Sequence, residues 1–332
     1  MEKIYIIAEI GPNHNGSLSL AKKMINKISK TGADAVKFQL AEPEKVYSKE
    51  AFKANYQKKN DNSKTILEMS KKFQLSKKDH FELSKYCKKK GITYLCSAFD
   101  LESLQYLVNK LKIPIIKIPS GEILTTDILK FASKFKGQII LSTGMSSLND
   151  IKKSLSLLKK SNVTLLHCVS LYPTNLDKVN LNNIHLLKRK FKLKVGFSDH
   201  TKGELASLIA ASMGITMLEK HVTLSNKMKG PDHKSSLQIE KFSKLVKKIR
   251  LIERIKGSNN RFISYEENKI KECVRKSIVA KKFLPRGLKL QNKHVIFKRP
   301  GTGISPIELK FFIGKKIIKP IKKDYLIKRN NF

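Results

Sequence analysis

Residues 4–29 read IYIIAEI GPNHNGS LSLAKKMINKIS and contain the pattern that decides the fold. The first seven residues form a nearly continuous apolar run, which is typical of a parallel strand buried on both faces. The last twelve carry apolar residues at spacings of three and four, which predicts an amphipathic helix with Ser17 as its N-cap. The loop between them is not GxGxxG, the loop expected after the first strand of a dinucleotide-binding sheet.

The same strand-and-helix unit recurs through the first 250 or so residues. The predicted strands are Ile4–Ile10, Ala35–Leu40, Thr93–Ser97, Ile115–Pro119, Gln138–Ser142, Val163–Cys168, Lys194–Phe197 and Thr216–Lys220. Eight such units in about 250 residues predict an α/β fold of the (β/α)8 TIM barrel type. An open doubly wound sheet is the alternative, although it usually has fewer strands.

The pattern changes after residue 256. We expect a (β/α)8 catalytic barrel over residues 1–256, a linker with some helix over 257–274, and a small β-rich domain over 275–332. The short segments of that domain are Ser277–Ala280, His294–Phe297 and Gly314–Ile318. A domain of this size is small enough to need a partner surface.

The composition limits the class of protein. Of 332 residues 40% are hydrophobic and 29% charged, which is typical of a globular chain. The apolar runs are far shorter than the ~20 residues of a membrane span, and the N-terminus lacks the pattern of a signal peptide. The four cysteines have no CxxC spacing. We therefore expect a cytoplasmic protein with reduced thiols and no membrane partner.

The formal net charge of +41 raises the question of a nucleic-acid partner. Only eight of the 68 basic residues are Arg, which is the residue preferred for phosphate and base contacts. The Lys residues are spread over the whole chain, which argues against nucleic acid. Lys, Asn and Ile are all plentiful and have A+T-rich codons, which favours an A+T-rich genome as the origin of the charge. A basic field that attracts an anionic substrate remains a further interpretation.

Polar and ionisable residues stand where the predicted strands end, and in a (β/α)8 barrel these ends form the active site. Lys37 and Lys117, with serines nearby, suit a small phosphate or carboxylate. The alternative is that these lysines pair with Glu9 or Glu122. His200 and His221 end neighbouring strands and suit a divalent first-row metal, with structural hydrogen bonding as the alternative.

Several motifs, taken together, resemble bacterial sialic acid synthases. In family order they include AEIGPNHNGS (8–17), KIPSGE (117–122), GFSDH (196–200), EKH (219–221), GPDHK (230–234) and KRPGTGISP (298–306). The resemblance implies a (β/α)8 barrel followed by an antifreeze-like (SAF) domain. It also implies a domain-swapped homodimer in which that small domain covers the barrel of the partner.

The activity that the resemblance implies joins phosphoenolpyruvate to an N-acetylated amino sugar, giving a nine-carbon 2-keto acid and phosphate. The first expectation is N-acetylmannosamine and N-acetylneuraminate. The alternative is 2,4-diacetamido-2,4,6-trideoxymannose and N,N'-diacetyllegionaminate. The GPDH motif at 230–233 favours these two branches over the pseudaminic branch and does not separate them.

The resemblance also implies roles for individual residues. His200 and His221 match catalytic metal ligands, usually for Mn²⁺, with Mg²⁺ or Co²⁺ as alternatives, and Glu9 matches a catalytic carboxylate near the reacting carbons. Positions for phosphoenolpyruvate are matched by Lys37, Ser97, Lys117, Ser120, Ser142, Ser170 and Ser198. Positions for the sugar are matched by Gln39, Glu122, Tyr172, Asp232 and Arg299, the last reaching across from the partner. Two other classes stay open: a barrel aldolase acting on a sugar phosphate, and a binding module for nucleic acid or carbohydrate.

Overall fold

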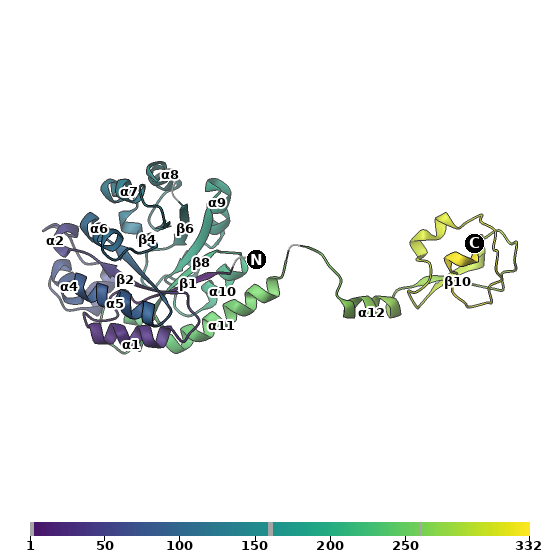
Figure 1. Ribbon diagram of the computed structural model, residues 1–332, viewed down its shortest axis with the longest axis horizontal. Helices are drawn as coiled ribbons and strands as arrows, with labels where there is room; N and C mark the ends of the chain where they lie inside the picture. The colour runs from purple at the N-terminus through teal and green to yellow at the C-terminus, as the bar shows by residue number, and fades with distance from the viewer. Residues whose placement is uncertain (1–2, 159–161, 259) are drawn as a thin grey trace. The chain divides into compact units, whose positions relative to one another are not determined.

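The computed structural model describes residues 3–158, 162–258 and 260–332. The chain divides into two compact units, Met1–Gly257 and Ser258–Phe332, each with its own hydrophobic core. The first unit carries the strand-end residues predicted from the sequence, and it is described first (Figure 1).

Eight parallel strands form a closed barrel in the first unit. Each strand pairs with the next along the chain, and β1 also pairs with β8, which closes the sheet. The strands are β1 (Tyr5–Glu9), β2 (Ala35–Leu40), β3 (Thr93–Ala98), β4 (Ile115–Ile118), β5 (Gln138–Ser142), β6 (Asn162–Cys168), β7 (Lys194–Asp199) and β8 (Met217–Thr223). The predicted TIM barrel is confirmed, and all eight predicted strands are present with ends within three residues.

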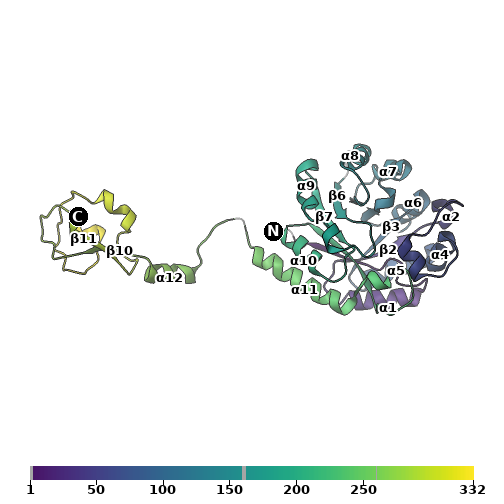
Figure 2. The same cartoon turned by 180° about the vertical axis from the view of Figure 1, so that it is seen from behind.

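Helices surround this barrel, as the two opposite views show (Figures 1 and 2). They are α1 (Leu18–Ile28), α5 (Lys77–Lys89), α6 (Leu101–Asn109), α7 (Thr126–Ala132), α8 (Leu148–Leu157), α9 (Asn182–Phe191), α10 (Leu205–Ser212) and α11 (Ile239–Lys256). A two-residue strand, β9 (Leu237–Gln238), pairs with the end of β8 just before α11. In the described part of the chain, no helix combines the length and the apolar content that a membrane crossing requires.

Three short helices between β2 and α5 are a feature that the sequence did not predict. They are α2 (Pro43–Val46), α3 (Asn55–Asn60) and α4 (Ile66–Phe73). The segment 41–74 therefore forms an excursion at the carboxyl end of β2, the end at which a barrel carries its active site.

The predicted cap of the first helix is present. Ser17 caps α1, since its side chain accepts from the backbone N–H of Leu20.

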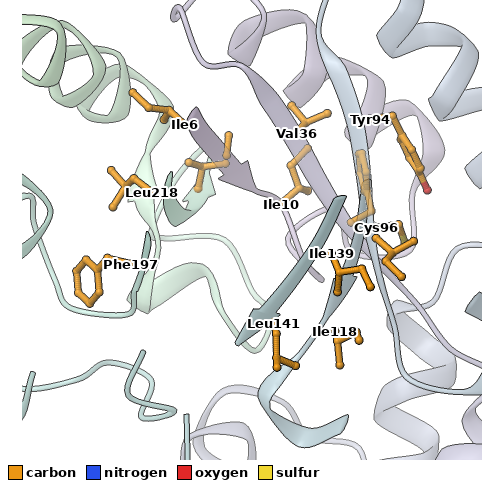
Figure 3. Packing of buried hydrophobic residues seen from close by; sticks show 14 of the residues in the cluster. Ile6, Ile10, Val36, Tyr94, Cys96, Ile118, Ile139, Leu141, Phe197 and Leu218 are labelled. Atoms are coloured by element: carbon orange, nitrogen blue, oxygen red, sulfur yellow. The ribbon is translucent and has the colours of Figure 1, made fainter. Parts of the chain in front are cut away.

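Alternation along the strands points successive side chains outward, toward the helices, or inward, into the barrel. Outward-facing residues fill the space between strands and helices, among them Ile6, Val36, Cys96, Ile118, Leu141, Phe197 and Leu218 (Figure 3). Inward-facing residues form a separate apolar cluster inside the barrel, made of Ile7, Ala35, Leu95, Ile140, Leu166 and Met217. Two residues further along the same strands the sequence has Glu9, Lys37, Ser97, Ser142, Cys168 and Glu219. The apolar cluster is thus the floor of a mostly polar pocket.

The second unit contains α12 (Tyr265–Val274) and a two-stranded antiparallel sheet of β10 (Ser277–Ala280) and β11 (Val295–Lys298). Its core includes Ile278, Leu284, Leu290, Ile304, Ile317 and Ile327. The predicted segment Gly314–Ile318 forms no strand. It starts with a turn at Gly314, whose φ is 81°, and pairs only through an isolated bridge between Lys289 and Lys316.

Candidate active site

A pocket of about 270 Å³ lies at the carboxyl ends of the barrel strands, and we call it the lysine pocket. Alternation along the strands brings these side chains together, since they lie on the inward face at or just beyond the strand ends, above the apolar floor. The lysine pocket contains most of the predicted site residues: Glu9, Lys37, Gln39, Ser97, Lys117, Ser120, Ser142, Ser170, Tyr172, Ser198, His200 and His221.

Lys37 is buried on β2 and has three polar neighbours. Its Nζ lies 2.9 Å from Glu9 Oε2 and 3.6 Å from Glu219 Oε2, and it donates to Ser97 Oγ at 2.9 Å. Burial alone would lower the pKa of Lys37, but the charges of Glu219 and Glu9 outweigh it and raise the pKa. Lys37 therefore stays charged inside the barrel.

Lys117 on β4 is the second buried cation of this pocket. Its Nζ donates to Ser142 Oγ at 2.7 Å and lies 3.6 Å from Glu219 Oε1. Burial lowers the pKa of Lys117, and Glu219 offsets part of that effect. The two ammonium groups thus share one carboxylate as a counter-ion.

Glu219 is a site residue to which the sequence analysis gave no role. Its carboxylate lies between Lys37 and Lys117 and accepts from Ser198 Oγ at 2.8 Å. Although burial opposes ionisation, the two lysines lower the pKa of Glu219 to about 2. The available signal was its place on the strand, two residues before His221 and therefore on the same inward face.

Glu9 lies on β1, the strand that pairs with β8, and its register partner there is His221. Its Oε1 accepts from Gln39 Nε2 at 2.9 Å, and its Oε2 pairs with Lys37. Burial raises the pKa of Glu9, Lys37 opposes this, and the charge of Glu219 adds to it. A carboxylate with a raised pKa in a pocket is suited to accept a proton.

His200 and His221 lie side by side at the rim of the same pocket, with ring centroids 5.4 Å apart. The Tyr172 ring packs on His200 with a centroid distance of 4.2 Å. His200 Nδ1 donates to the Val169 carbonyl at 2.7 Å, so Nε2 carries the lone pair and faces the Ser198 hydroxyl at 3.4 Å, a position from which it could bind a ligand. Burial lowers the pKa of His200 to about 4 and that of His221 well below its usual value, so both rings are neutral.

These two imidazoles fit a divalent metal as a partial ligand set. His221 Nδ1 is buried, makes no hydrogen bond within the described residues, and lies 3.5 Å from Asp232 Oδ2. Among those residues no group of three or more His, Cys, Asp or Glu side chains could hold a metal by itself. A metal held by His200 and His221 would need oxygen ligands from substrate or water, which first-row divalent ions accept.

A second pocket of about 220 Å³ adjoins the first, and we call it the side pocket. It is lined by Gly11, Pro12, His14, Ala41, Tyr47, Gln57, Met69, Ser70, Phe73, Gln74, Pro231 and Asp232. Five further lining residues are shared with the lysine pocket: Gln39, Tyr56, Phe99, Tyr172 and His221. Asp232, predicted to lie near the sugar, is in this pocket.

Two of the predicted sugar-binding residues lie outside both pockets. Glu122 Oε2 accepts from Thr125 Oγ1 at 2.6 Å, and Glu122 lines neither pocket. Arg299 belongs to the second unit, where it is exposed and follows β11. The structure thus brings together twelve of the fifteen predicted residues in the lysine pocket and Asp232 in its neighbour.

Comparison with known proteins matches residues 24–261 to the NeuB family. This chain belongs to the NeuB family. Its relatives include the N,N'-diacetyllegionaminic acid synthase of Campylobacter jejuni, with 44% identity over 99% of this chain and 100% of the relative. Another is the human N-acetylneuraminate-9-phosphate synthase, with 32% identity over 96% of this chain and 90% of the relative.

Solved structures give the same result for this NeuB-family chain. The N-acetylneuraminic acid synthetase of Leptospira borgpetersenii, solved in complex with citrate, matches with a TM-score of 0.73 and 32% identity. The match covers 81% of this chain and 90% of the Leptospira chain. The predicted family and enzyme class, a synthase of nonulosonic acids, are therefore confirmed.

Proposed function

We propose that this enzyme condenses phosphoenolpyruvate with open-chain 2,4-diacetamido-2,4,6-trideoxymannose to give N,N'-diacetyllegionaminate and phosphate. Two relatives named N,N'-diacetyllegionaminic acid synthase, at 44% and 38% identity, support this sugar. N-acetylmannosamine, the first expectation from the sequence, becomes the alternative. It is supported by the sialic acid synthetase of Leptospira at 32% identity.

The buried pair of lysines is the observation that carries the proposal. Lys37 and Lys117 face one pocket, and Ser97 and Ser142 bind their ammonium groups. Phosphoenolpyruvate carries a phosphate and a carboxylate, so it needs two cationic partners and several hydrogen-bond donors. We assign its phosphate and carboxylate to these lysines and to the serines of the same pocket.

The reaction consumes one water. The C3 carbon of phosphoenolpyruvate forms a bond to the aldehyde carbon of the sugar, whose oxygen takes up a proton and becomes a hydroxyl. Water then adds at C2 and loses a proton, for which Glu9 is the proposed acceptor because burial raises its pKa. The resulting tetrahedral carbon breaks its bond to the phosphate oxygen, which leaves a 2-keto acid and inorganic phosphate.

His200 and His221 are proposed to hold a divalent metal, with Mn²⁺ first and Mg²⁺ or Co²⁺ as alternatives. When bound, such an ion supplies a Lewis acid that polarises the aldehyde. The chain contributes two neutral imidazoles, one of them oriented by the Val169 carbonyl. Dialysis against a chelator should remove the metal and the turnover together, and Mn²⁺ should restore both. A His221→Ala protein that folds and keeps a full metal content would contradict the assignment.

The second unit is proposed to be the antifreeze-like domain of a homodimer, in which Arg299 reaches the sugar of the partner's site. The exposed position of Arg299 is compatible with that role. Mixed dimers test it: an Arg299→Ala chain and a Glu9→Gln chain, each inactive alone, should regain turnover when they are refolded together. Activity of Arg299→Ala at the wild-type level would contradict the role.

Phosphate release from phosphoenolpyruvate tests the function itself. The metal-loaded enzyme is assayed with the diacetamido sugar, with N-acetylmannosamine and with no sugar, and the keto acid is identified by mass. We expect release only with a sugar and faster release with the diacetamido sugar. Release with neither sugar, from folded and metal-loaded protein, would overturn the proposed function.

A further inference from the structure

The side pocket lacks the cations that the lysine pocket contains. None of the described residues that line it is Lys or Arg, although the chain has 68 of them. The one acid among those lining residues is Asp232, whose Oδ2 lies 3.5 Å from His221 Nδ1 at the border with the lysine pocket. A phosphate placed there would have no counter-ion, and burying an unpaired charge is costly. The lining of the side pocket therefore disfavours an anionic ligand and suits an uncharged one.

Two neutral nitrogen donors line the same pocket. His14 is 2% exposed, and its Nδ1 accepts from the Gly16 backbone N–H at 3.1 Å, so its proton is on Nε2. No hydrogen bond within the described residues uses His14 Nε2. Gln74 Nε2 is buried and also has no hydrogen-bond partner among those residues. Two unused N–H donors in one pocket without Lys or Arg fit the carbonyl oxygen of an amide.

The 41–74 excursion adds an apolar part to the wall, beside the polar side chains of Gln57 and Ser70. Met69 is 6% exposed, and Phe73 and Tyr47 line the pocket beside it. Asn60 Nδ2, from the same excursion, donates to the Pro231 carbonyl at 3.0 Å, which ties this wall to the loop after β8. Apolar side chains of this kind can pack against the methyl groups of a ligand.

We infer that the side pocket binds the end of the acceptor sugar remote from its aldehyde, and that it selects an uncharged N-acylated end over a phosphorylated one. The inference rests on the proposed function, in which the aldehyde lies near His200 and His221. Because His221 and Tyr172 border both pockets, the rest of the open chain extends from there into the side pocket. The carbonyl of the distal acetamido group accepts from His14 and Gln74.

The test compares three acceptors: the diacetamido sugar, N-acetylmannosamine and N-acetylmannosamine 6-phosphate. For the wild-type enzyme we expect kcat/KM to be highest for the diacetamido sugar and lowest for the phosphorylated one. Gln74→Leu should lower kcat/KM for the diacetamido sugar about tenfold, because an amide carbonyl loses a buried donor. The loss for N-acetylmannosamine should be about twofold, since that sugar has no distal amide. The KM for phosphoenolpyruvate should not change.

Gln105→Leu is the matched control, because Gln105 is a half-buried glutamine on α6 that lines neither pocket. Equal losses for both unphosphorylated sugars in Gln74→Leu would overturn the inference, as would a wild-type preference for the 6-phosphate. Both results would leave the condensation itself intact, whereas no phosphate release with any acceptor would overturn the proposed function. If Gln74→Leu does not fold, kcat/KM for the same acceptors is measured with His14→Asn instead.

Discussion

The lysine pocket and the side pocket share a border and differ in how they are built. The first is lined from strands, and its charges interlock: Glu219 is held by both Lys37 and Lys117. The second takes much of its wall from short helices between β2 and α5, and there the Gln74 amide nitrogen has no hydrogen-bond partner among the residues that the structure describes. Under the proposed function this difference corresponds to two tasks: the barrel would hold the anionic substrate, and the excursion would recognise the neutral one.

The two constructions have different energetic consequences. A buried charge is tolerated only with partners. Removing one charged side chain of the lysine pocket therefore leaves its partners buried without a compensating charge, which is strongly unfavourable. An unpaired buried amide costs less, about 1–3 kcal/mol, and a ligand or water can relieve it. We therefore expect substitutions in the lysine pocket to have larger effects than those in the side pocket.

The largest effect should follow from Lys117→Met. This change keeps the apolar stem and removes the ammonium group that binds Ser142. We expect kcat/KM for phosphoenolpyruvate to fall by about 10²–10³-fold, the usual loss when a preorganised electrostatic partner is removed from a buried site. Steady-state phosphate release measures it.

Lys220→Met provides the control for that experiment. Lys220 is equally buried on β8, but its Nζ pairs with Asp199 at 2.8 Å and donates to the Thr201 carbonyl, away from both pockets. The Lys220→Met protein should be less stable than the wild type and should keep most of its turnover per folded molecule. Equal loss of turnover in both variants would mean that buried charge as such, and not its place in the lysine pocket, is required.

A stability effect should follow from Glu219→Gln in the metal-free protein. The folded-state pKa of about 2 lies below the ordinary value of 4.5, so ionised Glu219 stabilises the fold above about pH 4.5. That contribution is lost as the pH falls through 2. At pH 7 the substitution should lower the free energy of unfolding by about 3 kcal/mol, measured with urea. Glu240→Gln, which removes an exposed pair with Lys27, should cost under about 1 kcal/mol.

In the side pocket, the stability contribution of His14 should decline at a higher pH than that of Glu219. Burial lowers the pKa of His14 to about 3 from its usual 6.5, so the neutral ring stabilises the fold above about pH 6.5. This contribution declines as the pH falls from 6.5 toward 3. Between pH 7 and pH 5 the metal-free wild type should lose about 2 kcal/mol more than His14→Asn, by urea denaturation. The same acid sensitivity in both proteins would mean that His14 is accessible to water and protonates freely.

How much the sequence predicts also differs between the two pockets. The lysine pocket was predictable because continuous apolar runs such as Ala35–Leu40 mark buried strands, and a Lys inside such a run is a conspicuous exception. The pairing of Glu219 with Lys37 and Lys117 was not predictable. It depends on which strands face each other across a closed barrel, and that information is tertiary.

The side pocket was largely invisible to sequence analysis. Its wall comes from the excursion 41–74, where helices of four, six and eight residues are too short to show a clear apolar period. From the sequence, His14 was placed only in the loop after the first strand and in a family motif, and nothing local shows that Gly16 fixes its tautomer. The walls of the side pocket therefore depend on tertiary contacts, whereas the polar residues of the lysine pocket are visible in the sequence at the strand ends.

The smallest expected effect is that of salt on the KM values. It should differ between the substrates proposed for the two pockets. The net charge of +41 should attract anionic phosphoenolpyruvate, and salt screens such attraction. Raising potassium chloride from about 50 to 200 mM should raise the KM for phosphoenolpyruvate about twofold to threefold and leave the KM for the sugar unchanged, because the sugar is neutral. Sodium sulfate at equal ionic strength should raise the first KM further if sulfate also competes for Lys37 and Lys117. An equal rise in both KM values would mean that the acceptor is charged, and the division between the two pockets would then be wrong.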